Sequence, residues 1–103
     1  MKYKSGEEPQ VGDIVRWQAT GGGSWREHEG EVVALVKAGE NIQLYEEDVL
    51  SEQVKPLDKG VLPIGKMDRL LVVVSRSGWE RLRDIPRPFL KAPFPGSLTL
   101  VGR

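Results

Sequence analysis

Arginines gather around a tryptophan in the C-terminal third of the chain, in a pattern suited to binding. An arginine beside an indole ring can hold a phosphate, an acidic side chain or a base through forked hydrogen bonds and stacking. The sequence therefore predicts a binding surface made of Arg76, Trp79, Arg81, Arg83 and Arg87. A second interpretation stays open, in which Trp79 is a core residue and the arginines pair across a sheet with Glu27, Glu29 and Glu31.

Groups that could catalyse a reaction are sparse in this chain. His28 is the only histidine, and there is no cysteine. Neighbouring side chains on a strand point to opposite faces, so Glu27 and Glu29 cannot both orient the His28 ring. We therefore expect an exposed, solvated His28 in a protein that is not an enzyme and has no metal site or cofactor. The acidic run 46–48 lacks the alternating oxygen ligands of a calcium loop and indicates the start of a helix instead.

The length of 103 residues fits a single domain, expected to span residues 1–103 with residues 1–10 as an N-terminal tail. Hydrophobic residues make up 39% and charged residues 29%, which is typical of a globular protein. The absence of cysteine excludes disulfides and is typical of a reducing compartment. The longest apolar run, residues 70–74, is far shorter than the roughly 20 residues of a spanning helix. A soluble cytoplasmic protein is expected.

Charge is balanced over the whole chain but not along it. Residues 1–65 hold 7 Lys and Arg against 12 Asp and Glu, and residues 66–103 hold 8 against 3. This asymmetry favours internal cancellation where adjacent strands bring opposite charges together. Together with exposed strand edges, the same asymmetry leaves a monomer and a homodimer equally open.

Glycines and prolines punctuate short apolar runs, which predicts an all-β, mainly antiparallel fold. Strands are expected at residues 12–20, 25–37, 67–76, 79–85 and 97–101, with a tight turn at 76–78 and a helical turn at 86–90. Gly30 marks a change from polar to apolar character, which indicates a bend or bulge. Residues 70–74 are apolar on both faces, as in a central strand covered on both sides.

We expect the strands to form a small barrel. Residues 38–65 form a long connection that we interpret as an insertion packed over this barrel. A short strand at 41–45 and a short helix around 46–54 are both compatible with its sequence, and periodicity does not decide between strand, helix and loop. The alternation of the strands predicts one barrel core, made of Val15, Trp17, Val33, Leu35, Leu71, Val73 and Leu100.

Two segments carry a resemblance to a known family. Val11-Gly-Asp-Ile-Val-Arg16, a glycine loop, and Glu29-Gly-Glu-Val-Val33 resemble the KOW-type pattern of two strands with a glycine at the entry to the second. The resemblance implies a five-stranded SH3-like small barrel and an RNA or ribosomal partner. The opening also resembles that of short proteins of phages and other mobile elements, a likeness that implies no particular activity. KOW modules tend to be basic around the glycine, whereas Glu27, Glu29 and Glu31 line this strand and would repel phosphate.

These observations predict a non-enzymatic binding module of phage or mobile-element type. The expected activity is protein–protein interaction, as an adaptor or as an inhibitor of a host complex, with an acidic protein surface as the partner. The alternative is a nucleic-acid-binding small barrel of the KOW kind, and an enzyme is the third possibility. No membrane partner is expected.

Overall fold

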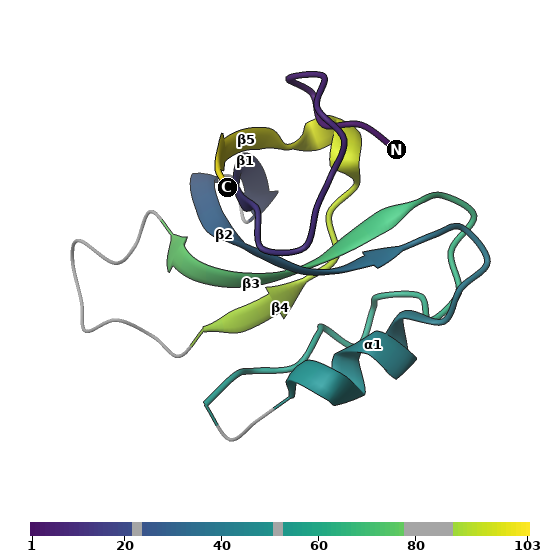
Figure 1. The fold of residues 1–103 in the computed structure, drawn as a ribbon. Coiled ribbons are helices and arrows are strands. Elements are labelled where there is room, and N and C mark those ends of the chain that lie inside the picture. The colour runs from purple at the N-terminus through teal and green to yellow at the C-terminus, as the bar shows by residue number, and fades with distance from the viewer. Residues whose placement is uncertain (22–23, 51–52, 78–87) are drawn as a thin grey trace.

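The described residues form an antiparallel five-stranded sheet and one short helix. The computed structural model describes residues 1–21, 24–50, 53–77 and 88–103, and for 19–21, 24–26 and 75–77 it describes the backbone alone. In chain order the elements are β1 (Ile14–Gly21), β2 (Ser24–Val36), α1 (Ile42–Val49), β3 (Arg69–Ser77), β4 (Phe89–Lys91), the 3₁₀ turn η1 (Pro95–Ser97) and β5 (Thr99–Gly102). The strands lie in the order β4-β3-β2-β1-β5 (Figure 1). The prediction of an all-β, mainly antiparallel fold with a short helical insertion is confirmed. The predicted closure into a barrel is not seen, because β4 and β5 are the two outer strands and do not pair with each other.

The interior strand β3 is apolar on both faces because both faces are covered, as predicted. Alternate residues from Leu70 to Val74 enter a core that we call the Val15 core, and Leu71 enters one that we call the Ile42 core. Buried members of the Val15 core are Tyr3, Val15, Val32, Leu70, Val72, Val74 and Leu98. Buried members of the Ile42 core are Ala34, Val36, Ile42, Leu71 and Leu90. The expectation of one barrel core is therefore wrong: Leu71 and Val73 lie on the other side of the sheet from Val15.

Two irregularities in β2 set the phase of its side chains. The register against β3 shifts between Glu29 and Gly30, which confirms the predicted bulge. A Cβ at Gly30 would collide with the carbonyl oxygen of Val73, so only glycine fits this close approach. A second shift falls between Val32 and Ala34, where Val33 is the extra residue. Because one inserted residue flips the faces, Val32 lies in the Val15 core while Ala34 lies in the Ile42 core.

The helix α1 covers the Ile42 core from below the sheet in the view of Figure 1. It begins earlier than the predicted 46–54, because Asn41 provides an N-cap whose side chain accepts a hydrogen bond from the Gln43 amide at 2.9 Å. Residues 42–45 are thus helical, and the strand considered for 41–45 is wrong apart from an isolated bridge between Asn41 and Ile64. This is the one α-helix in the described ranges, and it is too short to cross a membrane.

The C-terminal third departs from the prediction at its turns. β3 continues through Ser77, so residues 76 and 77 are strand rather than turn. Phe89 and Leu90, expected in a helical turn, form β4 beside β3. Pro88 and Pro93 lie just outside this short strand, where they remove no donor from its pairing and their carbonyls accept from the Lys55 and Leu70 amides. The helical turn lies later, at η1, where it leads into β5. The returning strand expected at 79–85 falls outside the described residues.

Residues 1–10, expected as a tail, pack against the sheet. Tyr3 is 3% exposed and belongs to the Val15 core. The Lys4 amide donates to the carbonyl of Leu98 at 2.8 Å, and Ser5 Oγ accepts from the Leu100 amide at 3.3 Å. The N-terminal segment therefore covers the outer edge of β5.

Candidate functional site

The predicted arginine surface falls largely outside the described residues. Trp79, Arg81, Arg83 and Arg87 all lie in residues 78–87, and of Arg76 the backbone alone is described. That backbone lies in β3, directly opposite Glu29 of β2. We call the three glutamates of β2, Glu27, Glu29 and Glu31, the acidic stripe. The register is compatible with pairing between the arginines and this stripe, so both interpretations of the cluster remain predictions.

The acidic stripe on β2 has a partner that the sequence reasoning missed. Arg16 of β1 lies opposite Glu29, and its guanidinium contacts Glu27 at 2.8 Å and Glu29 at 3.0 Å. The signal was present in the sequence, since an antiparallel hairpin closing at the glycine loop pairs residue 16 with residue 29. Such exposed ion pairs contribute little to stability. Their effect here is to neutralise the positive charge of Arg16.

His28 is buried, and the expectation of an exposed histidine is wrong. Its side chain lies between two aromatic rings, with ring centroids 5.4 Å from Trp17 and 5.7 Å from Phe89. The alternation that directs Glu27 and Glu29 outward directs His28 inward, onto the face of the Val15 core. The imidazole is thereby part of the packing around Trp17.

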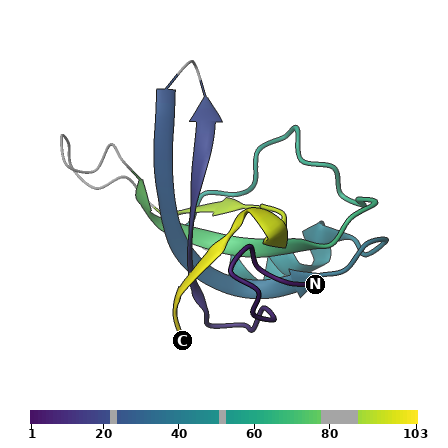
Figure 2. The same ribbon diagram turned by 90° about the horizontal axis from the view of Figure 1, so that it is seen from above.

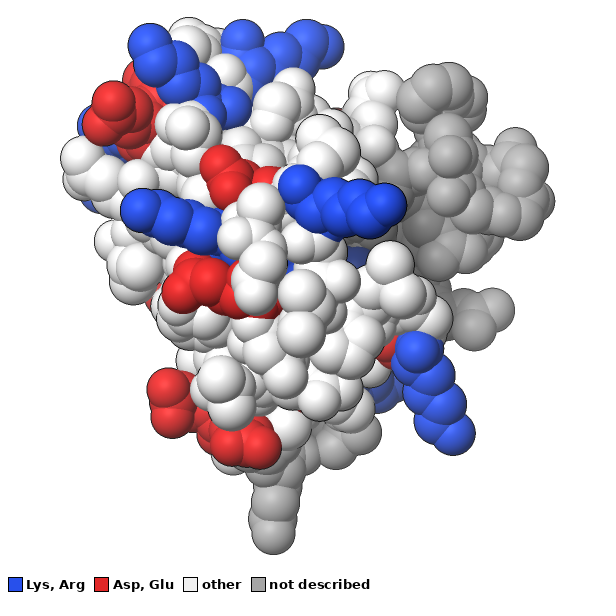
Figure 3. Space-filling view, turned by 90° about the vertical axis from the view of Figure 1, so that its right-hand side faces the viewer, with Lys and Arg blue, Asp and Glu red and all other residues white. Residues whose placement is uncertain are grey.

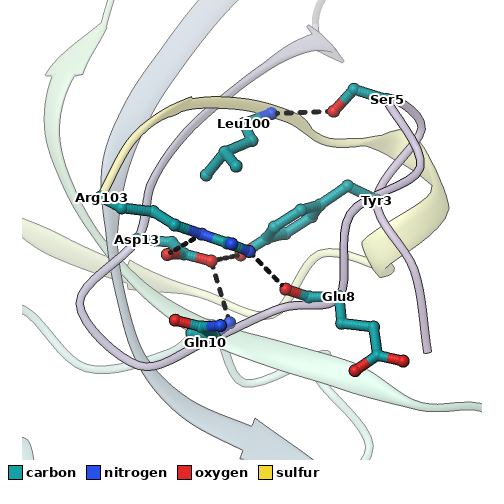
Figure 4. A network of polar contacts seen from close by, with 7 residues as sticks. All are labelled: Tyr3, Ser5, Glu8, Gln10, Asp13, Leu100 and Arg103. Carbon is teal, nitrogen blue, oxygen red and sulfur yellow. Dashed lines mark hydrogen bonds and ion pairs between the residues drawn. The ribbon is translucent and has the colours of Figure 1, made fainter.

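A polar network joins the N-terminal segment to the last residue (Figure 4). The carboxylate of Asp13, which is 2% exposed, accepts hydrogen bonds from the Tyr3 hydroxyl at 2.7 Å, the Gln10 amide at 2.9 Å and Arg103 Nε at 3.1 Å. Burial alone would raise the pKa of Asp13, but the hydrogen bonds from Tyr3 and Gln10 and the Arg103 charge together hold it below its usual value. Burial and the Asp13 carboxylate raise the pKa of the Tyr3 hydroxyl, which stays a donor. Because both carboxylate oxygens of Asp13 accept hydrogen bonds from this network, the network ties the N-terminal segment to Arg103.

An open depression, which we call the Trp17 groove, lies where β5 begins. Its volume is about 760 Å³, within the range of ligand sites in proteins. Trp17 is half-buried, so one part of its ring packs against the Val15 core while the rest faces the groove. The other lining residues come from the N-terminal segment, the β1–β2 hairpin, η1 and β5: Lys4, Arg16, Gln18, Glu27, Gly96, Ser97 and Thr99.

A second depression, which we call the Met67 groove, lies on the other side of η1. Its volume is about 620 Å³, and Gly96 and Ser97 line both grooves. Its apolar surface comes mainly from Met67 and Phe94, which are 61% and 47% exposed. Lys2, Lys66 and Asp68 add charge at its margin. Figure 3 shows this side of the molecule, where charged side chains of both signs are scattered over a broad uncharged surface.

We call the two grooves and the turn between them the η1 surface. Its acidic groups are occupied: Glu27 pairs with Arg16, and Asp68 accepts a hydrogen bond from the Ala38 amide at 2.9 Å. In contrast Lys2, Lys4 and Lys66 form no ion pair with any described residue. Four cations (Lys2, Lys4, Arg16 and Lys66) and two carboxylates (Glu27 and Asp68) line the two grooves, so the η1 surface combines exposed apolar side chains with a net charge of about +2.

The described residues offer little for catalysis at this surface. None of them form a group of three His, Cys, Asp or Glu side chains that could hold a metal ion. The hydroxyls of Ser97 and Thr99 line the Trp17 groove, but His28 lines neither groove. What the arrangement can do is bind, through an indole ring, hydroxyl groups and ammonium groups around an open depression.

Comparisons of the chain with protein-family models, with curated proteins and with solved structures find no match. The resemblance to KOW modules and SH3-like barrels thus stays an interpretation of the sequence.

Proposed function

We propose that this protein is a non-catalytic binding module whose η1 surface holds an acidic segment of a partner protein. The observation that carries the proposal is the combination of three lysines lacking an acidic partner among the described residues with the exposed apolar side chains they flank. Apolar and aromatic side chains anchor protein interfaces, and charge at the rim selects the partner and speeds its approach.

A protein ligand suits this surface better than a nucleic acid does. Tracking a phosphate backbone calls for a broad basic face, whereas the whole chain has a formal net charge of zero. Arg16 is already paired with Glu27 and Glu29, so Lys4 is the unpaired cation among the described residues that line the Trp17 groove; one lysine can meet a single acidic side chain but not a run of phosphates. Single-stranded nucleic acid remains the second candidate, because Trp17 beside Lys4 could stack a base and contact a phosphate.

The wider role that we propose follows the likeness to phage and mobile-element proteins. A small module that binds an acidic segment can act as an adaptor, or it can occupy a host surface and block the host complex. The proposal places this activity in the cytoplasm. Disulfide bonds rarely persist in that reducing compartment, and this chain has no cysteine to form one.

The test uses a capped peptide that alternates valine with glutamate, compared with one that alternates valine with glutamine. We expect saturable binding of the acidic peptide and weaker binding of the neutral one, measured by calorimetry. Replacing Lys4 and Lys66 with Glu should weaken binding of the acidic peptide by about tenfold, since two charges at the rim change from attractive to repulsive. The matched control replaces Lys55 and Lys59, which are exposed but line neither groove.

Two results would contradict the proposal. One is equal affinity for the acidic and the neutral peptide, or an equal effect of the two double substitutions. The other is tight binding of mixed-sequence single-stranded RNA that weakens steeply with salt, by about 0.7 log units per tenfold salt for each neutralised phosphate. The second result would move nucleic-acid binding to first place.

A further inference from the structure

The hairpin of β1 and β2 extends beyond the rest of the sheet (Figure 2). β1 pairs with β2 as far as Gly21 opposite Ser24, but it pairs with β5 only at Ile14, Val15 and Arg16. From Trp17 to Gly21, β1 thus has β2 on one side and no strand of the described chain on the other. This stretch is an open strand edge, which we call the Trp17–Gly21 edge.

The register shows which backbone groups face the open side. The Val32 amide donates to the Asp13 carbonyl and the Gly12 amide donates to the Val32 carbonyl, so Asp13 directs its carbonyl toward β2. In an antiparallel pair this direction alternates along the strand. Residues 15, 17, 19 and 21 therefore bond to β2, and Gln18 and Thr20 direct their N–H and C=O groups to the open side.

The Trp17 groove lies where a continuation of β5 would run. Thr99 is the first residue of β5 and lies across from Arg16, where the pairing of β5 with β1 stops. Before Thr99 the chain turns away, because the Leu98 amide donates to the Pro95 carbonyl and the Leu98 carbonyl accepts from Lys4. The 3₁₀ turn η1 thus diverts the segment that would otherwise pair with Gln18. Gln18, Ser97 and Thr99 line the resulting groove.

Other outer edges of the sheet are covered by the chain itself. Lys55 pairs with the outside of β4, where its amide donates to Pro88 and its carbonyl accepts from Leu90. The N-terminal segment covers β5 through Lys4 and Ser5. Proteins generally cover or blunt strand edges because bare ones pair with other chains. The Trp17–Gly21 edge has no such cover from a strand of the described chain, and it borders the Trp17 groove.

We propose that an extended segment of the partner protein adds to the sheet as a strand on the Trp17–Gly21 edge, in line with β5. This inference rests on the proposed function and names how the same site holds its ligand. Main-chain hydrogen bonds to Gln18 and Thr20 supply affinity, and alternate side chains supply selectivity. One set of them meets Trp17, and an acidic side chain is drawn to Lys4 at the rim of the groove.

The test compares two substitutions at one position, with the valine–glutamate peptide as the probe. Gln18→Pro removes an outward N–H group but no bond to β2, and proline is tolerated on strand edges. Gln18→Ala removes the side chain and keeps the backbone donor. Both variants lose the Gln18 side chain and differ in the backbone donor, so we expect Gln18→Pro to bind the peptide at least about tenfold more weakly than Gln18→Ala does. Far-ultraviolet circular dichroism confirms that each variant is folded.

Amide hydrogen exchange provides the second readout and needs no variant. Saturation with the peptide should slow exchange at Gln18 and Thr20, whose N–H groups gain acceptors. Equal binding by both variants, or unchanged exchange at these amides in a saturated complex, would overturn strand addition while leaving the proposed function intact. Absence of any peptide binding would overturn both. Slowed exchange that grows with protein concentration in the absence of peptide would show instead that the edge pairs with a second copy of this chain.

Discussion

Asp13 is a buried charge whose position explains how the two ends of the chain are held. Its carboxylate binds Tyr3 and Gln10 on the N-terminal side and Arg103 at the other end (Figure 4). A buried carboxylate is tolerated when its oxygens are hydrogen-bonded and a cation lies close. The N-terminal segment held in this way also covers β5 and contributes Lys4 to the Trp17 groove.

Replacing Asp13 with Asn should lower the free energy of unfolding at pH 7 by about 1–3 kcal/mol, because Arg103 loses its counter-charge and the donors lose a charged acceptor. The folded-state pKa of Asp13 lies below its usual value, so its stabilisation is present above about pH 4 and is lost as pH falls through the folded pKa. The difference between parent and variant should therefore shrink toward pH 3. Urea unfolding at both pH values measures it, with the exposed Asp58→Asn as control. A difference that is constant with pH would contradict the charge-based account.

Gly30 provides a test of the bulge at the level of a single atom. Gly30→Ala should destabilise the protein by about 1–3 kcal/mol, because the added methyl group meets the backbone of Val73 and lies 2.8 Å from Val72 Cγ1. At Gly60 a Cβ meets nothing within 4 Å, so Gly60→Ala should change stability by less than about 0.5 kcal/mol. Thermal unfolding of the two variants makes the comparison. Equal stability of the Gly30→Ala and Gly60→Ala variants would mean that β2 and β3 move apart at the bulge and make room for the methyl group.

Individual residues could be assigned from the sequence only where their surroundings are local. Gly30 was identified as a bulge because a glycine at a change of polarity is informative by itself. His28 was assigned to the wrong environment because its charged neighbours in sequence are not its neighbours in space. Its real neighbours, Trp17 and Phe89, come from β1 and β4, and only the sheet brings them together.

At the level of elements, alternation predicted the strands well and their phase less well. β1, β2, β3 and β5 fall close to the predicted ranges, because apolar runs bounded by turn residues survive any error in pairing. The extra residue at Val33 reverses the faces of β2, and no periodicity reveals such an insertion. α1 begins several residues before the predicted 46–54, because Asn41 caps it and the acidic run 46–48 lies in its second half and not in its first turn.

The contribution of α1 to the stability of the fold can be measured by truncating a side chain on its buried face. Ile42 is 1% exposed in the Ile42 core, so Ile42→Ala should cost about 2–5 kcal/mol through lost contacts and a residual cavity. Leu44, on the same helix, is 64% exposed, and Leu44→Ala should be nearly neutral. Chemical denaturation of both variants checks the prediction. A larger loss for Leu44→Ala would show that α1 packs on the sheet by its other face.

For the whole molecule, the arginine cluster remains an independent prediction. Replacing Arg81 and Arg83 with Glu should weaken binding of the acidic peptide, because the loss of two positive charges and the gain of two negative ones lower the attractive field over the surface. The loss should fall at high salt. Trp79→Ala separates the two interpretations of the tryptophan, since a contact residue affects binding and a core residue lowers the melting temperature. Parent-like binding in both folded variants would remove the cluster from the binding surface.

The candidate site was less predictable than the fold because it depends on where the chain turns. The grooves exist because η1 diverts the chain before β5 and because β1 is longer than β5. The sequence placed the helical turn at 86–90, and no feature of Lys4, Trp17 and Ser97 marks them as neighbours. The arginines at 76–87 predict an acidic protein partner from the sequence, whereas in the structure the lysines of the η1 surface support the same partner.

The most direct measurement of the central claim is a titration with the valine–glutamate peptide, followed by amide nitrogen–proton correlation spectra. The account predicts that the shifted amide signals cluster on the η1 surface, at Lys4, Gln18, Ser97 and Thr99 around the Trp17 groove. Signals from residues around Lys55 and Lys59 should stay in place. Saturable binding whose shifts leave the η1 surface unchanged, whether they fall at residues 78–87 or on α1, would contradict it.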